Sequence, residues 1–385
     1  MAIEYLQDLT GLSLLLIVGL LISFLALKLR IPEVLLLIIG GALFSPFLNL
    51  PGSFLTSLSI FALIVIVFDS VSGFNINEIK RISPKAFKLT FIYFIANLIF
   101  LTFFTHLFFG GEFTINNVLM SLIFAGLMSG TDPSVALTML KDMKNKVVDI
   151  VKVESIINTP LNVIIPLIIL DVYKGIFEAN VVLQSFLQNV MAGVGTGIVI
   201  GLIVFGLMRK RYSESLSPIV IVAAALISYS LAENIGGSGI LSVTALGVIY
   251  SISELREKRS LGKFTNVFAS FLKIIVFMLL GFIIRVPVDP IFLLKTIALF
   301  VIYLIIRHLV VQISFPDFKI GEKLFMTFNI SKGVASAVVV FILGSLNLPG
   351  LEWVIHVSFA FIIYSILVET IASRFSEKML ENDNT

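Results

Sequence analysis

The stretch VKVESIINTPLNV (residues 151–163) places polar side chains inside a long apolar segment of the chain. Glu154, Asn158 and Asn162 recur every four residues and therefore share one face of a helix. The surrounding run, residues 147–171, is long enough to cross a bilayer as a helix. Charges inside a bilayer are costly and usually line a route for ions or protons. The stretch therefore predicts a membrane-spanning helix with one functional polar face.

The composition of the whole chain supports a membrane class. Of its 385 residues 58% are hydrophobic and 13% are charged, whereas soluble domains carry about 25% charged residues. Apolar runs of about 18 to 25 residues predict an all-α polytopic membrane protein, and the alternating strands of a membrane barrel are absent from the sequence. The lack of cysteine excludes disulfides and thiolate metal sites. We expect the lipid bilayer as a partner, and neither nucleic acid nor a cofactor.

The hydropathy pattern predicts a single transmembrane domain over residues 1–385, ending in a short cytoplasmic tail at 375–385. About 13 spans are expected, at residues 9–28, 32–48, 54–74, 85–109, 114–140, 147–171, 182–208, 216–234, 237–253, 265–284, 289–311, 322–345 and 351–373. One extra span between two six-span halves places the halves in opposite orientations. We therefore predict inverted repeats at 1–171 and 216–374, joined by a linker helix at 182–208.

The basic residues predict the orientation of the chain. With the N-terminus outside, the inside loops and the tail hold 20 Lys and Arg residues, and the outside loops hold only Lys174 and Arg285. Such an excess is the positive-inside pattern of membrane proteins. The first apolar run is long enough to remain as a span, so no cleavable signal peptide is expected. We predict a multi-pass protein of the cell membrane, with its N-terminus outside and its C-terminus in the cytoplasm.

The segment SGTDPSVALTML (129–140) predicts a break in the fifth span. Gly130 and Pro133 bracket Thr131 and Asp132, and proline disfavours helical geometry in the residue before it. A broken helix leaves free carbonyl and N–H groups that can hold ions, and a carboxylate beside them is a natural cation ligand. The alternative is a proline kink whose Asp132 only caps the second half-helix.

The segment FNISKGVASAVVV (328–340) predicts a second break, in the twelfth span. Ser331 and Lys332 precede Gly333 within another apolar run. The fifth and twelfth spans are equivalent in the predicted repeat, so two broken helices are expected to cross near the middle of the membrane. Lys332 is the expected partner of the buried acid Glu154.

The polar face of 151–163 has two interpretations. With Ser155 and Thr159 beside them, Glu154 and the two asparagines supply oxygen ligands that suit hard cations such as Na⁺ or K⁺. Alternatively, the amides hold neighbouring spans together by hydrogen bonds.

Other polar residues in the spans carry weaker expectations. Arg307 is predicted to lie near the inner interface and extend to water, which is the usual behaviour of arginine there. His106, near a span end, is interpreted as structural. Asp69 either lines an access route or caps a solvated helix end. Glu369 is expected to line the core or to pair with a base.

Six segments resemble the monovalent cation:proton antiporter superfamily, most closely its NhaP and sodium/proton exchanger branch. The similarity covers nearly the whole chain, and its strength lies in the order and spacing of the segments. They are IPEVLLLIIGGALFSP (31–46), TDP (131–133), ESIINT (154–159), ENIGGSGILSVTALGV (233–248), IIVFMLLGFII (274–284) and SKG (331–333).

The resemblance implies a homodimer whose mobile six-helix core carries Na⁺ or K⁺ one way and H⁺ the other by alternating access. It implies that Thr131 offers its backbone carbonyl and that Asp132 and Ser155 serve the ion. It also implies that Glu154 pairs with the base of the twelfth span, here Lys332, and that Asn158 holds the crossing.

Two residues depart from the family pattern: Thr159 stands where the family has its main ion-binding aspartate, and Lys332 replaces an arginine. Threonine can ligate a cation but cannot titrate, so Asp132 is the expected proton and cation carrier, with Glu154 second. We predict a monovalent cation site at Asp132, Ser155 and Thr159.

The loss of the aspartate leaves two alternatives open: an uncoupled uniporter or channel-like protein, or an inactive ion-sensing homologue. An enzyme is not expected. GGSG (236–239) and His356 superficially look like an intramembrane serine protease, but such a dyad needs hydrogen-bond contact. The resemblance places Ser238 at a short outside turn.

Overall fold

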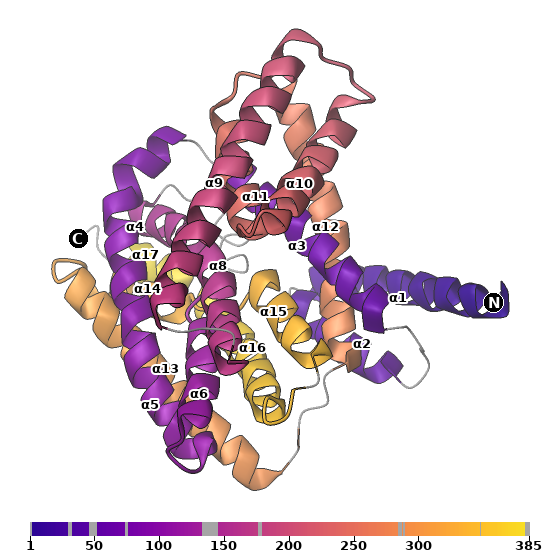
Figure 1. Cartoon of the computed structure of the whole chain (residues 1–385). Coiled ribbons are helices and arrows are strands. Elements are labelled where there is room, and N and C mark those ends of the chain that lie inside the picture. Colours follow the sequence, from indigo (N-terminus) through magenta and orange to yellow (C-terminus); the bar gives the residue numbers. More distant parts are fainter. Residues whose placement is uncertain are drawn as a thin grey trace. The chain divides into compact units, whose positions relative to one another are not determined.

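The computed structural model describes residues 2–29, 33–45, 52–73, 76–132, 145–175, 179–283, 287, 289–346 and 348–381. Its regular elements are all helical within these ranges, as the composition predicted (Figure 1). The helices are α1 (Ala2–Leu29), α2 (Glu33–Phe44), α3 (Gly52–Ser72), α4 (Ile76–Ala96), η2 (Asn97–Leu101), α5 (Thr102–Thr105), η3 (His106–Gly110), α6 (Ile115–Leu127), α8 (Lys146–Tyr173), α9 (Ala179–Lys210), α10 (Ser217–Asn234), α11 (Gly239–Ile252), α12 (Lys258–Ile283), α13 (Pro290–Ser314), α14 (Ile320–Phe328), α15 (Val334–Ser345), α16 (Glu352–Ser373) and α17 (Ser376–Glu381).

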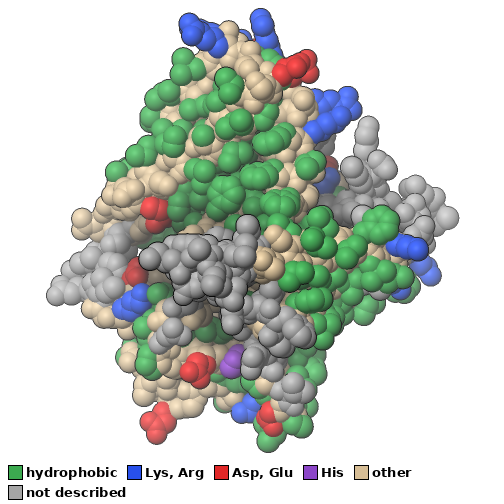
Figure 2. Space-filling view, turned by 90° about the vertical axis from the view of Figure 1, so that its right-hand side faces the viewer, with side chains coloured by type: hydrophobic (Ala, Val, Ile, Leu, Met, Phe, Trp, Pro, Cys, Tyr) green, Lys and Arg blue, Asp and Glu red, His purple; other side chains and the backbone are tan. Residues whose placement is uncertain are grey.

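The helices have the length and surface of a multi-pass membrane protein. In the described part of the chain, eight are long and apolar enough to cross a bilayer, and shorter apolar helices accompany them. Large apolar side chains are exposed along many of these helices, as lipid-facing surfaces require. Figure 2 shows this apolar covering in green, with Lys and Arg at the end of the α9–α10 part. The count of 13 spans stays a prediction.

The chain divides into two compact units. One contains residues 1–56, 82–173 and 274–385, and the other contains 57–81 and 174–273. In the second unit α9 packs closely on α11: a side chain at Gly193 or Gly197 would overlap the carbonyl groups of Ser238 or Ser242. All the predicted site residues belong to the first unit. The inverted repeats at 1–171 and 216–374 stay a prediction.

Both predicted helix breaks lie in the first unit. The twelfth span is split into α14 and α15 by a non-helical segment at 329–333, as predicted. In the fifth span α6 ends at Leu127, and a turn followed by non-helical backbone continues to Asp132. Pro133 and the rest of this predicted span, residues 133–144, lie outside the described residues.

The fourth predicted span, 85–109, has an internal feature that the sequence did not predict. It runs without interruption through α4, η2, α5 and η3, and η2 and η3 are π-helical. In a π-helix the backbone bonds to the residue five positions away, so each π-turn holds one residue more than an α-turn.

A close contact of two glycines joins α2 to the end of α12. A side chain at Gly41 would overlap the carbonyl group of Met278, and one at Gly281 would overlap the carbonyl group of Ile38. The two backbones therefore approach more closely than any residue with a Cβ allows, which is a common way for membrane helices to pack.

We expect Gly281→Ala to lower the thermal unfolding temperature of the detergent-solubilised protein, because the new methyl forces the two backbones apart at a cost of about 1–3 kcal/mol. Gly262→Ala is the matched control in the same helix, where a Cβ meets nothing within 4 Å. That variant should be neutral or slightly more stable. Equal melting of the two variants would contradict a tight α2–α12 contact.

Candidate functional site

The two interrupted helices meet through their backbones. The N–H of Asp132 donates to the carbonyl oxygen of Ser331 over 2.8 Å, and the Ser331 hydroxyl donates to the carbonyl oxygen of Asp132. The N–H of Ser331 donates to the Glu369 carboxylate over 2.7 Å. Backbone groups released by the breaks are thus satisfied by the opposite segment and by α16, which is a requirement inside a membrane.

The two asparagines of α8 hold the first interruption. The Asn158 amide donates to the Thr131 hydroxyl over 2.8 Å, and the Thr131 N–H donates back to its Oδ1 over 3.4 Å. The Gly130 N–H donates to Asn162 Oδ1 over 3.3 Å, and Asn162 Nδ2 donates to Ser336 over 2.8 Å. A Cβ at Gly130 would overlap the Asn162 amide, so glycine is required there. One face of α8 therefore ties the fifth span to α15.

Glu154 pairs with Arg307 rather than with Lys332, so the predicted partner is wrong. The guanidinium donates from Nη1 to Oε1 over 2.5 Å and from Nη2 to Oε2 over 2.7 Å, and both side chains are 0% exposed. Arg307 Nε donates to the Met326 carbonyl oxygen over 3.2 Å, and the guanidinium lies 4.5 Å from the centre of the Tyr93 ring. The planar fork of arginine suits a carboxylate in this two-bonded way.

The expectation that Arg307 extends to water near the inner interface is also wrong. The predicted span ended at 311, but α13 continues to Ser314. Arg307 therefore lies about 10 Å along the helix axis from that end, at 1.5 Å per residue. Arg307 lies four residues after Tyr303 and therefore shares its face of the helix. This spacing is the sequence signal that could have indicated a buried position for Arg307.

Lys332 instead ties down the end of α6. Its ammonium donates to the carbonyl oxygens of Met128 and Gly130 over 2.7 and 2.6 Å, and to the Tyr303 hydroxyl over 2.5 Å. These three bonds use all three ammonium protons. A positive charge at the C-terminal end of a helix is also favoured by the helix dipole. Lys332 therefore neutralises partial charges of the broken helix and has no proton left for Glu154.

The remaining predicted site residues are only half-buried. Asp132, Ser155 and Thr159 are each partly accessible, whereas Thr131 is buried. The Thr159 hydroxyl donates to the Ser155 carbonyl oxygen over 2.6 Å, and the Ser155 hydroxyl donates to the Lys152 carbonyl oxygen over 2.9 Å. Each hydroxyl donates its proton in one of these bonds, so the lone pairs of its oxygen are available to a cation.

The position of Asp132 follows from its neighbours. Thr131, the residue before Asp132, is bound to Asn158 in the part of α8 that also carries Ser155 and Thr159. On its other side a Cβ at Gly333 would overlap the Asp132 carboxylate, so that glycine gives the carboxylate its space. Within the described residues no group of three His, Cys, Asp or Glu side chains forms. Hydroxyls, carbonyls and one carboxylate are ligands that suit a hard monovalent cation.

Five charged side chains of the described residues lie at or beside the crossing. Arg307 pairs with Glu154, and Lys332 bonds to carbonyl oxygens at the end of α6. Glu369 accepts from the backbone of Ser331, and Asp132 lies at the first interruption. Among these described groups, three can carry a negative charge and two a positive charge. Glu369, which the sequence could not assign, is 0% exposed and belongs to this set.

A protein-family model described as "Sodium/hydrogen exchanger, transmembrane" matches residues 12–375 of the chain. Among curated proteins, the chain is 23% identical over 303 residues to a probable Na⁺/H⁺ antiporter 2 of Methanocaldococcus jannaschii, covering 72% of this chain and 69% of that protein. It is 23% identical over 288 residues to the low-affinity Na⁺/H⁺ antiporter NhaS1 of Synechocystis, covering 68% of this chain and 54% of that protein.

A K⁺/H⁺ antiporter, NhaP2 of a Shewanella species, is 23% identical over 262 residues, or 65% of this chain and 46% of that protein. The chain thus spans about half the length of these last two relatives. Among solved structures, the sodium proton antiporter MjNhaP1 of Methanocaldococcus jannaschii matches with a TM-score of 0.85 at 19% identity. The match covers 98% of this chain and 99% of that one.

Removing one partner of the Glu154–Arg307 pair should be strongly destabilising, because the other charge is left buried. We expect Arg307→Leu to cost about 3–5 kcal/mol, measured as loss of thermal stability in detergent. Arg209→Leu is the control: its bond to Glu254 has a similar length of 2.8 Å, but the side chains are 66% and 81% exposed. That change should cost at most about 1 kcal/mol. Glu154→Gln combined with Arg307→Leu should recover part of the loss, and a fully additive double variant would argue against the pair.

Proposed function

The chain belongs to the sodium/hydrogen exchanger family, and from this premise we propose that it is a secondary-active antiporter that exchanges Na⁺ or K⁺ for H⁺ by alternating access. In this proposal Asp132 is the carboxylate that takes either the cation or the proton. The curated relatives named as Na⁺/H⁺ and K⁺/H⁺ antiporters support the exchange, and their names differ in the cation.

The single observation that carries the proposal is the set of charged groups that the described residues hold at the crossing. Arg307 is paired with Glu154. In this proposal Lys332 balances Glu369, and Asp132 takes either one proton or one monovalent cation, but not both. Mutually exclusive binding at one charge is what coupled exchange requires, and a one-for-one exchange moves no net charge.

We place the other cation ligands on α8 and at the first interruption. Ser155 and Thr159 supply hydroxyl oxygens from α8, and Thr131 supplies its backbone carbonyl at the interruption. A hydroxyl ligates a cation without competing for protons, so Thr159 can replace a carboxylate as a ligand but not as a titrating group. Proton competition in this site therefore falls on Asp132, and Glu154 is excluded from it by its bond to Arg307.

The resemblance supports further proposals about assembly. We propose a homodimer in the cell membrane, with its N-terminus outside, its C-terminus in the cytoplasm and inverted repeats at 1–171 and 216–374. An uncoupled uniporter and an inactive ion sensor remain the competing functions, and the assay below separates them.

We expect Asp132→Asn to abolish cation-driven proton movement, because an amide can neither release a proton nor balance a cation. The measurement is a dye-reported pH gradient in proteoliposomes. Addition of Na⁺, K⁺ or Li⁺ should collapse the gradient with the unaltered protein and leave it intact with the variant. Glu112→Gln, a change of an exposed loop carboxylate, is the control and should exchange normally.

Exchange that survives Asp132→Asn would reject this carrier. Cation flux without proton movement in the unaltered protein would establish a uniporter, and no flux with any cation would establish a sensor.

Thr159→Asp should make the exchange sensitive to membrane potential, because a second titrating carboxylate allows two protons to move against one cation. The unaltered protein should be insensitive, as should Thr159→Asn, which changes the polar group without adding charge. The measurement is the rate of Na⁺-driven gradient collapse at potentials set by a gradient of a permeant anion such as thiocyanate, because K⁺ is itself a candidate substrate. Voltage dependence in the unaltered protein would contradict a single balancing charge at Asp132.

A further inference from the structure

The fourth span carries a column of buried polar side chains with unused hydrogen-bonding atoms. Asn97 is 0% exposed and His106 is 2% exposed, and neither side chain makes a protein hydrogen bond of normal length and angle within the described part of the chain, although Asn97 lies close to the Tyr93 hydroxyl. The hydroxyls in the same condition along this span belong to Thr90, Tyr93, Thr102 and Thr105. A buried polar group without a partner is rare in proteins, and bound water is a usual explanation.

The threonines of the column differ from many hydroxyl residues described elsewhere in the chain. Ser121, Ser129 and Thr327 each donate to the carbonyl oxygen four residues before them, over 3.0, 2.7 and 2.7 Å. That back-bond is the ordinary way for a hydroxyl to be satisfied within a helix. Thr90, Thr102 and Thr105 do not form it. Their hydroxyls are therefore available to a group other than their own backbone.

The π-turn at η2 places the column on one face. In a regular α-helix Asn97 and Thr102 would point about 140° apart, since each residue turns by about 100°. The five-residue hydrogen bonding of η2 (Asn97–Leu101) adds one residue to the turn and brings the two positions toward the same side. A second π-turn, η3, follows at His106. π-turns of this kind are often found at functional sites.

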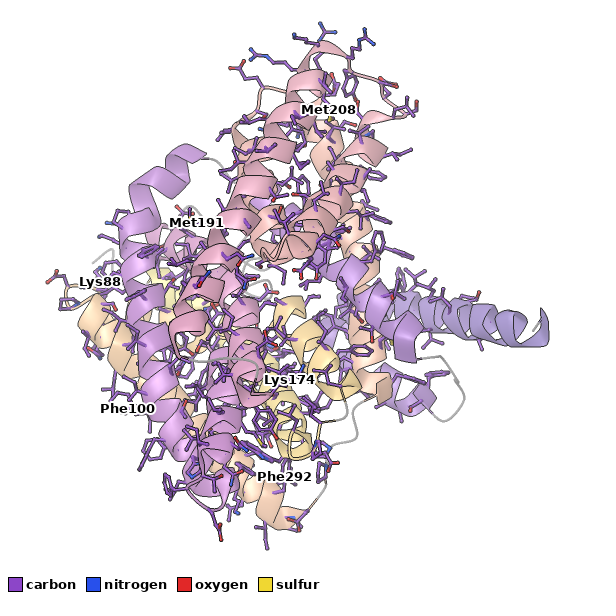
Figure 3. The ribbon with its side chains drawn as sticks, viewed as in Figure 1. Lys88, Phe100, Lys174, Met191, Met208 and Phe292 are labelled. Carbon is purple, nitrogen blue, oxygen red and sulfur yellow. The ribbon has the colours of Figure 1, made fainter. Side chains whose placement is uncertain are left out.

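This span lies against α13, which runs in the opposite direction. Lys88 donates to the Ser314 carbonyl oxygen at one end, and Lys295 donates to the Phe108 carbonyl oxygen at the other. Figure 3 labels Lys88 and Phe292 near these two ends. Ser314 adds another buried hydroxyl without a partner. The column is therefore enclosed inside the first unit.

The column reaches the crossing through two tyrosines. The Tyr93 and Tyr303 rings are 6.1 Å apart, and the Tyr303 hydroxyl accepts from the Lys332 ammonium over 2.5 Å. Lys332 in turn is bonded to the carbonyl oxygen of Gly130, two residues before Asp132. A hydrogen-bonded chain along the column would thus end beside the proposed carrier.

We propose that this column, Thr90, Tyr93, Asn97, Thr102, Thr105 and His106, binds a file of water molecules that conducts protons toward Lys332 and the crossing. Hydroxyl, amide and imidazole groups each donate and accept, so they can anchor water along the whole file. Each water passes one proton onward as it receives another, so atoms and charge balance without any redox partner. The file relays charge by proton hops between hydrogen-bonded waters, a route that Na⁺ and K⁺ cannot follow.

The role in proton delivery rests on the proposed antiport, whereas the bound water does not. X-ray hydroxyl-radical footprinting with mass spectrometry in H₂¹⁸O labels side chains beside bound water even when they are buried. Tyr93 and His106 should be labelled, at least tenfold more than the equally buried Phe124 and Phe361. Asn97→Leu should reduce the label on Tyr93 severalfold, and Ser121→Ala, which removes a satisfied hydroxyl from α6, should leave it unchanged.

Thermal stability gives an independent reading of the same variant. If the column is wet, Asn97→Leu removes a water ligand and should leave the melting temperature unchanged or lower it. If the column is dry, the change removes an unsatisfied amide and should raise the melting temperature. Background labelling of Tyr93 and His106, or a clear rise in stability, would overturn the proposal.

Transport assays separate the two proposals. Asn97→Leu should slow gradient collapse in proteoliposomes about tenfold while leaving ²²Na⁺ binding unchanged, because it interrupts the water file and not the cation site. Unchanged exchange in a variant that has lost the Tyr93 label would overturn the role in proton delivery. If the unaltered protein shows no antiport at all, the proposed function fails, and the footprint still decides whether water is bound.

Discussion

The structure depends on one constraint: backbone groups released by a broken helix inside a membrane must find partners within the protein. Here each break supplies partners for the other. The N–H of Asp132 and the carbonyl oxygen of Ser331 bond directly, and Asn158, Asn162 and Lys332 take up the neighbouring groups of the first break. Because all of these contacts involve the same few residues, the geometry that makes the crossing stable also fixes where the Asp132 carboxylate stands.

The two buried bases, Arg307 and Lys332, have different partners because their side chains have different shapes. Arg307 presents parallel N–H groups in one plane, which match the two oxygens of Glu154. Lys332 presents three protons at a single point, and three oxygens converge on it from the end of α6 and from Tyr303. An exchange of the two bases would leave a fork facing scattered carbonyls and a single ammonium facing two carboxylate oxygens. Lysine at position 332 is therefore compatible with the site because its task is to cap a helix.

Local signals in the sequence predicted the two helix breaks, but they could not predict which distant residues pair. Glycine and proline around Thr131 and the SKG segment have direct effects on backbone geometry, so the breaks in the fifth and twelfth spans could be placed to within a few residues. The partner of Glu154 is separated from it by 153 residues, and nothing in a single sequence links the two positions. The π-turns were equally hidden, because NLIFL has the composition of any apolar helix. In the structure η2 and η3 both pack against α6, and η2 also packs against α13.

The π-turn at Asn97–Leu101 has a consequence for comparisons between relatives. A π-turn amounts to one inserted residue, so a relative with a regular helix here would align with a single gap in the middle of a span. Such a gap is normally moved to the nearest loop as an alignment error. In this span its position would be informative, because a regular helix with one residue fewer holds the position equivalent to Thr102 four residues after Asn97, about 40° away, and keeps both on the same side. Such a gap would then mark the loss of the π-turn, and the polar residues on both sides of it would show whether the buried column has been kept.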